Sequence, residues 1–184
     1  MKVLILNGSP RVNGDTVYLI NKVKEKFPSD TIFEEINAYY DDIKPCMDCR
    51  HCWEHKGCAI HDKMDLVYKD DYEVVIIASP IYMSYVTPPL FSIFTRFNYM
   101  YSNKHFLNIT NEMKKKKGIL ILVGGGDGAP DDAIKISSRT FRKLNAEFDI
   151  EKDYIYSLNT DSVPVKDDKE VDSLIDKIIE HILK

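Results

Sequence analysis

The four cysteines of the chain stand within one short stretch, where their spacing could support metal or redox chemistry. Cys46, Cys49, Cys52 and Cys58 follow the pattern C-x2-C-x2-C-x5-C. Three closely spaced thiolates with a fourth nearby can hold a 4Fe-4S cluster, although bacterial ferredoxins space the last ligand differently. Zinc is a second alternative, but zinc sites commonly separate two ligand pairs by a longer loop. In the third alternative the thiols bind no metal and either undergo redox chemistry or stay idle.

Length and charge limit the classes of function. The 184 residues suffice for one domain with a full core and are few for two. A formal net charge of −4 argues against nucleic acid or an anionic membrane as a partner. No apolar run approaches the ~18 residues of a membrane span, and the first one is too short for a signal peptide. We therefore expect a cytoplasmic protein, where clustered cysteines favour metal or redox chemistry over disulfides.

Short apolar runs alternate with helical patterns along the chain. The runs predict strands at 2–7, 31–37, 73–79, 118–124 and 153–159, the last of them near a sheet edge. Apolar residues at helical spacing predict helices at 16–27, 88–101, 131–147 and from 169 onward.

This alternation predicts an α/β fold. Right-handed βαβ units would build a five-stranded parallel sheet with helices on both faces, and five strands suit the flavodoxin-like order 2-1-3-4-5. We expect residues 1–184 to form one domain, with a cysteine-rich loop at 44–61 inserted after the second strand. Ligands of such sheets bind outside the carboxyl ends of the strands.

The loop after the first strand, "NGSPRVNGDT" (7–16), could bind a phosphate. Small and hydroxyl residues entering a helix present unpaired backbone N–H groups, to which Ser9 and Thr16 add hydroxyls and Arg11 a cation. The loop has neither a Walker A motif nor G-x-G-x-x-G, so a monophosphate fits better than a dinucleotide. A tight turn with an ordinary helix cap is the alternative.

Two further loops fall at the same predicted edge. "SPIYMSYVTPPL" (79–90) offers Tyr82, Met83 and Tyr85 as apolar surface for a planar ring. "GGGDGAP" (124–130) allows a ligand to approach the backbone closely. Each loop alone has an ordinary structural explanation, but together the three loops describe a pocket for a nucleotide with a planar ring.

These three motifs, in this order and spacing, resemble the NADPH-dependent FMN reductase family of flavodoxin-like proteins. The resemblance covers Met1 to roughly Asp132 and implies FMN as the cofactor. It implies that the FMN phosphate, ribityl chain and ring contact Ser9, Arg11, Asn13, Asp15, Thr16, Pro80, Ile81, Tyr82, Met83, Gly124, Gly125, Gly126 and Asp127. Two positions depart from the family pattern. Asp15 replaces a more usual Ser or Asn, so its carboxylate must point away from the phosphate or be offset by Arg11. Thr95 stands where an acidic residue is common.

The resemblance implies an FMN-dependent NAD(P)H oxidoreductase that passes electrons to a small acceptor such as a quinone or free flavin. No catalytic side chain is assigned, because the flavin carries the chemistry. The alternative is an iron–sulfur flavoprotein electron carrier whose 4Fe-4S cluster is bound by the four cysteines and serves a redox protein. A binding module that has lost its flavin is a third hypothesis, motivated by Asp15. A homodimer or homotetramer is implied, with the aromatic segment 91–102 as the contact.

Overall fold

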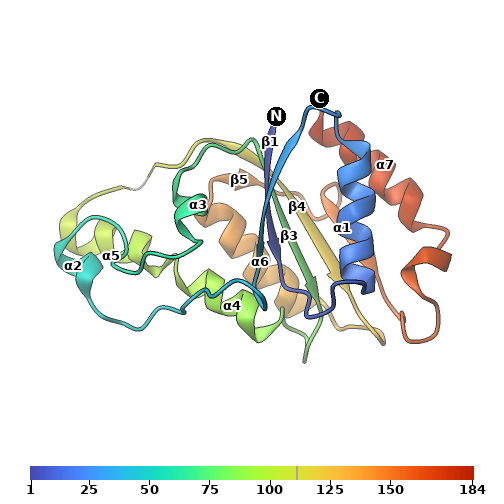
Figure 1. The fold of residues 1–184 in the computed structure, drawn as a ribbon, viewed down its shortest axis with the longest axis horizontal. Coiled ribbons are helices and arrows are strands. Elements are labelled where there is room, and N and C mark those ends of the chain that lie inside the picture. Colours follow the sequence, from blue (N-terminus) through green and yellow to red (C-terminus); the bar gives the residue numbers. More distant parts are fainter. Residues whose placement is uncertain (111) are drawn as a thin grey trace.

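The computed structural model describes every residue of the chain except 111. Its strands are β1 (Lys2–Asn7), β2 (Ile32–Asn37), β3 (Val74–Pro80), β4 (Lys116–Val123), β5 (Ala146–Glu147) and β6 (Tyr154–Ser157). They run parallel in the order β2-β1-β3-β4-β5, and β6 pairs with the second half of β4 (Figure 1). The five predicted strands are present, and the predicted 2-1-3-4-5 order is confirmed.

Burial explains why the strands could be found from sequence. The central strands β1, β3 and β4 are covered on both faces, so nearly every residue in them is buried and their sequences are continuous apolar runs. In the edge strand β2 only Ile36 is buried. The predicted edge position of 153–159 is also correct, since β6 pairs only with β4 among the described strands.

Helices cover both faces of the sheet (Figure 1). α1 (Asp15–Lys26) and α7 (Val171–Ile182) pack on one face, and Leu19, Val23 and Ile175 are fully buried there. α3 (Asp65–Tyr68), α4 (Pro88–Thr95) and α6 (Asp131–Lys143) pack on the other. The remaining helical segments are α2 (His51–Glu54) and α5 (Asn98–Leu107), which lie together at one end, and the 3-10 turn η1 (Val165–Asp167).

Two predicted helices are wrong in part. The segment 88–101 is broken between α4 and α5, where the Arg96 and Phe97 amides bond three residues back, to Ile93 and Phe94. Arg96 is buried at this break. The segment 131–147 ends as a helix at Lys143, and Ala146–Glu147 pairs with β4 as β5, because sheet pairing there overrides the helical pattern.

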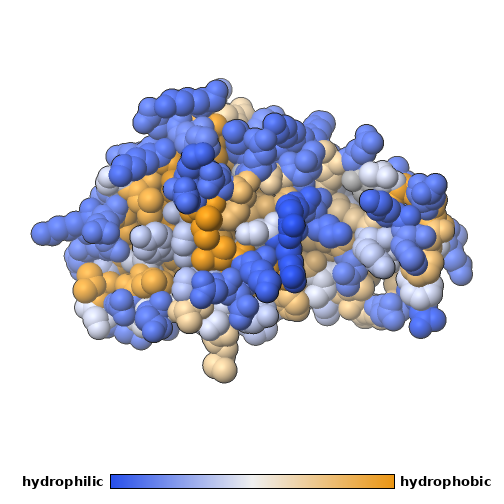
Figure 2. Space-filling view, turned by 180° about the vertical axis from the view of Figure 1, so that it is seen from behind, coloured by the Kyte–Doolittle hydropathy of each residue, from blue (hydrophilic) through white to orange (hydrophobic). Residues whose placement is uncertain are grey.

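Among the described residues no helix is both long and apolar enough to cross a bilayer. The face seen from behind carries hydrophilic side chains over most of its area, with apolar patches between them (Figure 2).

Gly118 of β4 generates a stability prediction. A Cβ there would stand 2.9 Å from Phe141 Cδ1 and 3.1 Å from the Glu147 carbonyl oxygen, inside the core. We expect Gly118→Ala to lower the free energy of unfolding by about 1–3 kcal/mol through overpacking, measured by urea denaturation. Gly126→Ala is the control, because a Cβ at Gly126 meets open space. Equal urea midpoints for the two variants would contradict the packing.

Candidate functional site

A cavity of about 250 Å³ opens at the carboxyl ends of the strands, where the three predicted loops meet. Its walls are formed by Ser9, Pro10, Arg11, Gly14, Asp15, Thr16, Pro80, Ile81, Tyr82, Val123, Gly125, Thr160 and Asp161. The structure therefore brings together eight of the predicted site residues: Ser9, Arg11, Asp15, Thr16, Pro80, Ile81, Tyr82 and Gly125. The other predicted residues, Asn13, Met83, Gly124, Gly126 and Asp127, belong to the same loops but lie outside this wall.

The turn after β1 is held in one shape by its own hydrogen bonds. The Gly8 amide donates to the Ala78 carbonyl at 2.7 Å, and the buried Ser9 amide donates to Asn7 Oδ1 at 2.8 Å. Ser9 Oγ donates to the Arg11 carbonyl at 2.9 Å and lies 3.2 Å from the Arg11 amide. The hydroxyl of Ser9 thus shapes the turn, and the cavity beside it stays open.

Helix α1 points its first turn at this cavity. It begins after Gly14, which provides no side-chain cap, and Asp15 and Thr16 of that turn line the cavity wall. Amides at a helix N-terminus lack intrahelical acceptors, and the helix dipole adds positive potential there. Together with Arg11, this end of the cavity suits an anion such as a phosphate.

The Asp15 carboxylate is partly directed away from the cavity. Its Oδ1 accepts a hydrogen bond from the Val165 amide at 3.2 Å, which ties α1 to the turn before α7. This contact gives Asp15 a structural role in addition to its place in the cavity wall.

Buried polar contacts join the first loop to the second. Thr87 Oγ1 donates to the Gly8 carbonyl at 2.9 Å, and the Thr87 amide donates to Ser79 Oγ at 3.1 Å. Both Thr87 and Ser79 are fully buried. A Cβ on Gly8 would stand 2.9 Å from Thr87 Oγ1 and from Leu90 Cδ2, so the first loop can approach this closely only with glycine.

The second loop directs Tyr82 and Met83 differently. Tyr82 and Tyr85 exchange backbone hydrogen bonds of 2.8 and 2.9 Å, closing a two-residue turn in which Met83 and Ser84 have φ of 51° and 67°. Left-handed geometry at both central residues is that of a type I′ hairpin turn. It leaves Met83 96% exposed, while Tyr82 stays at the cavity.

A fourth loop, which the sequence analysis did not single out, completes the cavity. The amides of Asn159, Thr160 and Asp161 donate to the carbonyls of the glycine loop 124–126 at 2.7–3.1 Å. This backbone pairing brings Thr160 and Asp161 into the wall. The turn-forming residues "NTDS" (159–162) after the last strand were the available signal.

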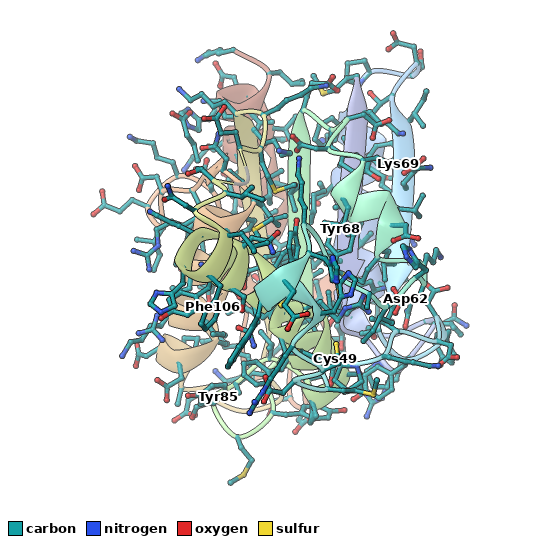
Figure 3. All side chains as sticks on the ribbon, turned by 90° about the vertical axis from the view of Figure 1, so that its left-hand side faces the viewer. Cys49, Asp62, Tyr68, Lys69, Tyr85 and Phe106 are labelled. Carbon is teal, nitrogen blue, oxygen red and sulfur yellow. The ribbon has the colours of Figure 1, made fainter. Side chains whose placement is uncertain are left out.

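The four cysteines line a second, larger cavity of about 510 Å³ between the loop 44–61 and α5. Cys46 and Cys49 are exposed, and Cys52 and Cys58 are half-buried. Figure 3 views the molecule from this end, with Cys49 and Phe106 on the near side. The residues that line this cysteine cavity are all different from those that line the first cavity, so the two sites are separate features of the fold.

The cysteine cavity brings four thiols and the guanidinium of Arg96 into one wall. Within the described residues, no three His, Cys, Asp or Glu side chains converge on a point where a single ion could be held. A 4Fe-4S cluster bonds each of its thiolates through a different iron, so its ligands stand further apart. The guanidinium of Arg96, in the same wall, has an Nε that is buried without a hydrogen-bond partner among the described residues. Four thiols beside a cationic donor are the kind of groups that a cluster with anionic thiolate ligands would need.

Comparison with known proteins identifies related sequences and folds. A family model described as NADPH-dependent FMN reductase matches residues 1–145. An iron-sulfur flavoprotein of Methanocaldococcus jannaschii is 29% identical over 127 residues, covering 67% of this chain and 62% of that protein. An iron-sulfur flavoprotein of Archaeoglobus fulgidus is 27% identical over 124 residues, covering 65% of this chain and 60% of that protein. The matches thus span about three fifths of each relative's length.

A solved structure shows the same fold at lower sequence identity. The FMN-dependent NADH-azoreductase of Bacillus anthracis, determined in complex with FMN, superposes with a TM-score of 0.60 at 18% identity. The likeness covers all of this chain and 98% of that one, and it supports the fold.

The exposure of the thiols generates a prediction. In metal-free, reduced protein, Cys46 and Cys49 should be alkylated by iodoacetamide faster than Cys52 and Cys58, because the latter pair is half-buried. Peptide mass spectrometry after timed quenching resolves the four rates. Equal rates at all four positions would mean that the loop does not keep this shape in solution.

Proposed function

The chain belongs to the NADPH-dependent FMN reductase family of flavin-dependent oxidoreductases, and we propose that it binds FMN in the cavity at the carboxyl ends of β1, β3 and β4. The observation that carries this proposal is the convergence of the uncapped start of α1, Arg11 and the Ser9 turn on one cavity. The relative solved with FMN has the same fold, which supports the choice of ligand.

The size of the cavity suggests which part of FMN it encloses. About 250 Å³ is less than the roughly 300–1,000 Å³ typical of cavities that enclose a whole small ligand. The phosphate-bearing tail would enter between the first and fourth loops, where Ser9, Arg11 and Thr16 lie. The ring would remain at the mouth, beside Pro80, Ile81 and the 43% exposed Tyr82.

The residues of the chain would bind and orient the cofactor. Flavin supplies hydride and electron transfer between a nicotinamide and an acceptor when it is bound. Backbone amides of the first turn of α1 would donate hydrogen bonds to the phosphate, and the Arg11 guanidinium would balance its charge. Gly125, which has no side chain, would let the backbone of the glycine loop approach the cofactor from the side of β4. With the ring at an open mouth, one face stays accessible to NAD(P)H and then to a small acceptor such as a quinone or free flavin.

The second candidate function is that of an iron–sulfur flavoprotein that delivers electrons to a redox protein. It is favoured by the four thiols in one cavity and by the names of the two curated relatives. In this case Cys46, Cys49, Cys52 and Cys58 would hold a 4Fe-4S cluster beside Arg96. We propose that either form assembles as a homodimer or homotetramer in the cytoplasm.

The phosphate position is tested by Arg11→Ala. Losing a charge-assisted contact should weaken FMN binding by about 1.5–3 kcal/mol, measured by fluorescence titration of the apoprotein. Riboflavin, which lacks the phosphate, should bind both forms equally. Arg139→Ala removes an exposed cation on α6 as the matched control. An unchanged FMN affinity in Arg11→Ala would place the phosphate elsewhere.

The two candidate functions are separated by purification without air. Yellow, iron-free protein whose NADPH oxidation is stimulated by a quinone would support the reductase. Brown protein with about four irons per chain would support the electron carrier. Protein that neither saturates with micromolar FMN nor contains iron would contradict both functions.

A further inference from the structure

The cysteine loop 44–61 has little regular structure of its own to keep its shape. Its one helical segment is α2, a single turn, and Asp48, Arg50 and Gly57 all have left-handed φ, at 50°, 61° and 89°. Such conformations are unfavourable for residues other than glycine and persist when surrounding contacts impose them. The contacts that hold this loop therefore decide where its thiols lie.

Asn103 of α5 supplies the densest set of these contacts. Its Nδ2 donates to the Cys52 carbonyl at 2.7 Å and to the His55 carbonyl at 3.0 Å, and its Oδ1 accepts from the Gly57 amide at 2.8 Å. Because its partners are two carbonyl acceptors and one N–H donor, the side-chain amide of Asn103 can take only one orientation. Asn103 is fully buried, and its three partners span Cys52 to Gly57, immediately before Cys58.

The α4–α5 break anchors the rest of the loop. Thr95 Oγ1 accepts from the Cys46 amide at 3.0 Å. The Arg96 guanidinium donates to the carbonyls of Lys44 and Ile60 at 3.0 and 2.7 Å, and it pairs with Asp62 at 2.5 Å. Arg96 thus joins the two ends of the loop, and Thr95 holds its first cysteine.

Stacking adds an apolar contact between α2 and α5. The ring of Trp53 in α2 lies on that of Phe106 in α5, with centroids 4.2 Å apart and planes 19° from parallel. This pair presses α2 against the helix that carries Asn103.

We propose that Asn103 is a positioning residue, which, with Thr95 and Arg96, folds the backbone of the cysteine loop so that the four thiols face one cavity before any cluster arrives. The contacts go to main-chain atoms of the loop, so they act without metal. The identity of the group that the thiols receive rests on the second candidate function, but the positioning itself does not. A preformed loop would spare an incoming cluster the entropy of ordering its ligands.

Variants of Asn103 test the proposal in metal-free protein. Asn103→Ala removes all three contacts. Asn103→Asp keeps an oxygen that can accept from the Gly57 amide, but its second oxygen replaces the Nδ2 donor and would face the carbonyl oxygens of Cys52 and His55. Lys104→Ala changes the next residue of α5, which is exposed, and is the matched control. Arg96 is unsuitable as a first test, because its loss would leave Asp62 as an unpaired, nearly buried charge.

Two readouts report on the loop itself. Asn103→Ala removes three buried hydrogen bonds, and the loss of even one raises the open population of the loop by about tenfold, so alkylation of Cys52 and Cys58 should become at least about tenfold faster. Exchange of the Gly57 amide hydrogen, followed by NMR, should accelerate to the same degree. Alkylation in Asn103→Asp should resemble that in Asn103→Ala, and Lys104→Ala should match the unchanged protein.

The outcomes separate this inference from the proposed function. FMN affinity should be unaffected by the Asn103 variants, because Asn103 does not line the cavity at the carboxyl ends of the strands. Protein reconstituted with iron and sulfide should lose its iron to a chelator at least about tenfold faster in Asn103→Ala, as expected for the same loop opening. If the unchanged protein takes up no iron, the cluster is contradicted, while the thiol rates still test the positioning. Wild-type thiol rates and Gly57 exchange in both Asn103 variants would overturn the proposal.

Discussion

The hydrogen bond from Thr87 to the Gly8 carbonyl joins the turns that follow β1 and β3, and the cavity proposed for FMN depends on it. Thr87 in turn is held by Ser79, the next-to-last residue of β3, so the sheet itself sets the distance between the two turns. Both residues are fully buried, where an unmade hydrogen bond is costly. Gly8 permits the contact because no side chain intervenes. The first and second loops are therefore one rigid wall, against which a phosphate and a ring can be held at a fixed separation.

The opposite wall is built from backbone as well. The glycine loop after β4 pairs with residues 159–161 through main-chain hydrogen bonds, and this pairing closes the cavity from the other side. The cavity wall also includes side chains, among them those of Arg11, Thr16, Tyr82 and Asp161. Such a wall suits a cofactor that supplies its own chemistry, because the protein has only to bind and orient it.

The cysteine loop is organised by different means. It lies at the far end of α4 and α5 and is held by side chains, Thr95, Arg96 and Asn103, that reach its main chain. Its cavity shares no wall residue with the FMN cavity among the described residues. A flavin reductase could consequently keep its flavin site intact whether or not the loop carries a cluster. This separation explains how both candidate functions remain compatible with one fold.

The sequence predicted what local patterns determine. Continuous apolar runs identified β1, β3 and β4, and the composition of 7–16 identified the turn that meets the start of α1. It could not predict features that depend on distant partners. The break at Arg96 is accompanied by an ion pair with Asp62, thirty-four residues away, and Thr160 and Asp161 enter the cavity only through pairing with the glycine loop. The exposed position of Met83 also could not be predicted, because it depends on a left-handed turn that no single residue type indicates.

The most direct test of the central claim is a crystal structure of the chain grown with FMN. Density for the phosphate is expected between the turn after β1 and the first turn of α1, within hydrogen-bond distance of their amides. Density for the ring is expected beside Tyr82. A cavity filled by the side chains of Arg11, Asp15 and Asp161, with FMN absent or bound at another surface, would contradict the account.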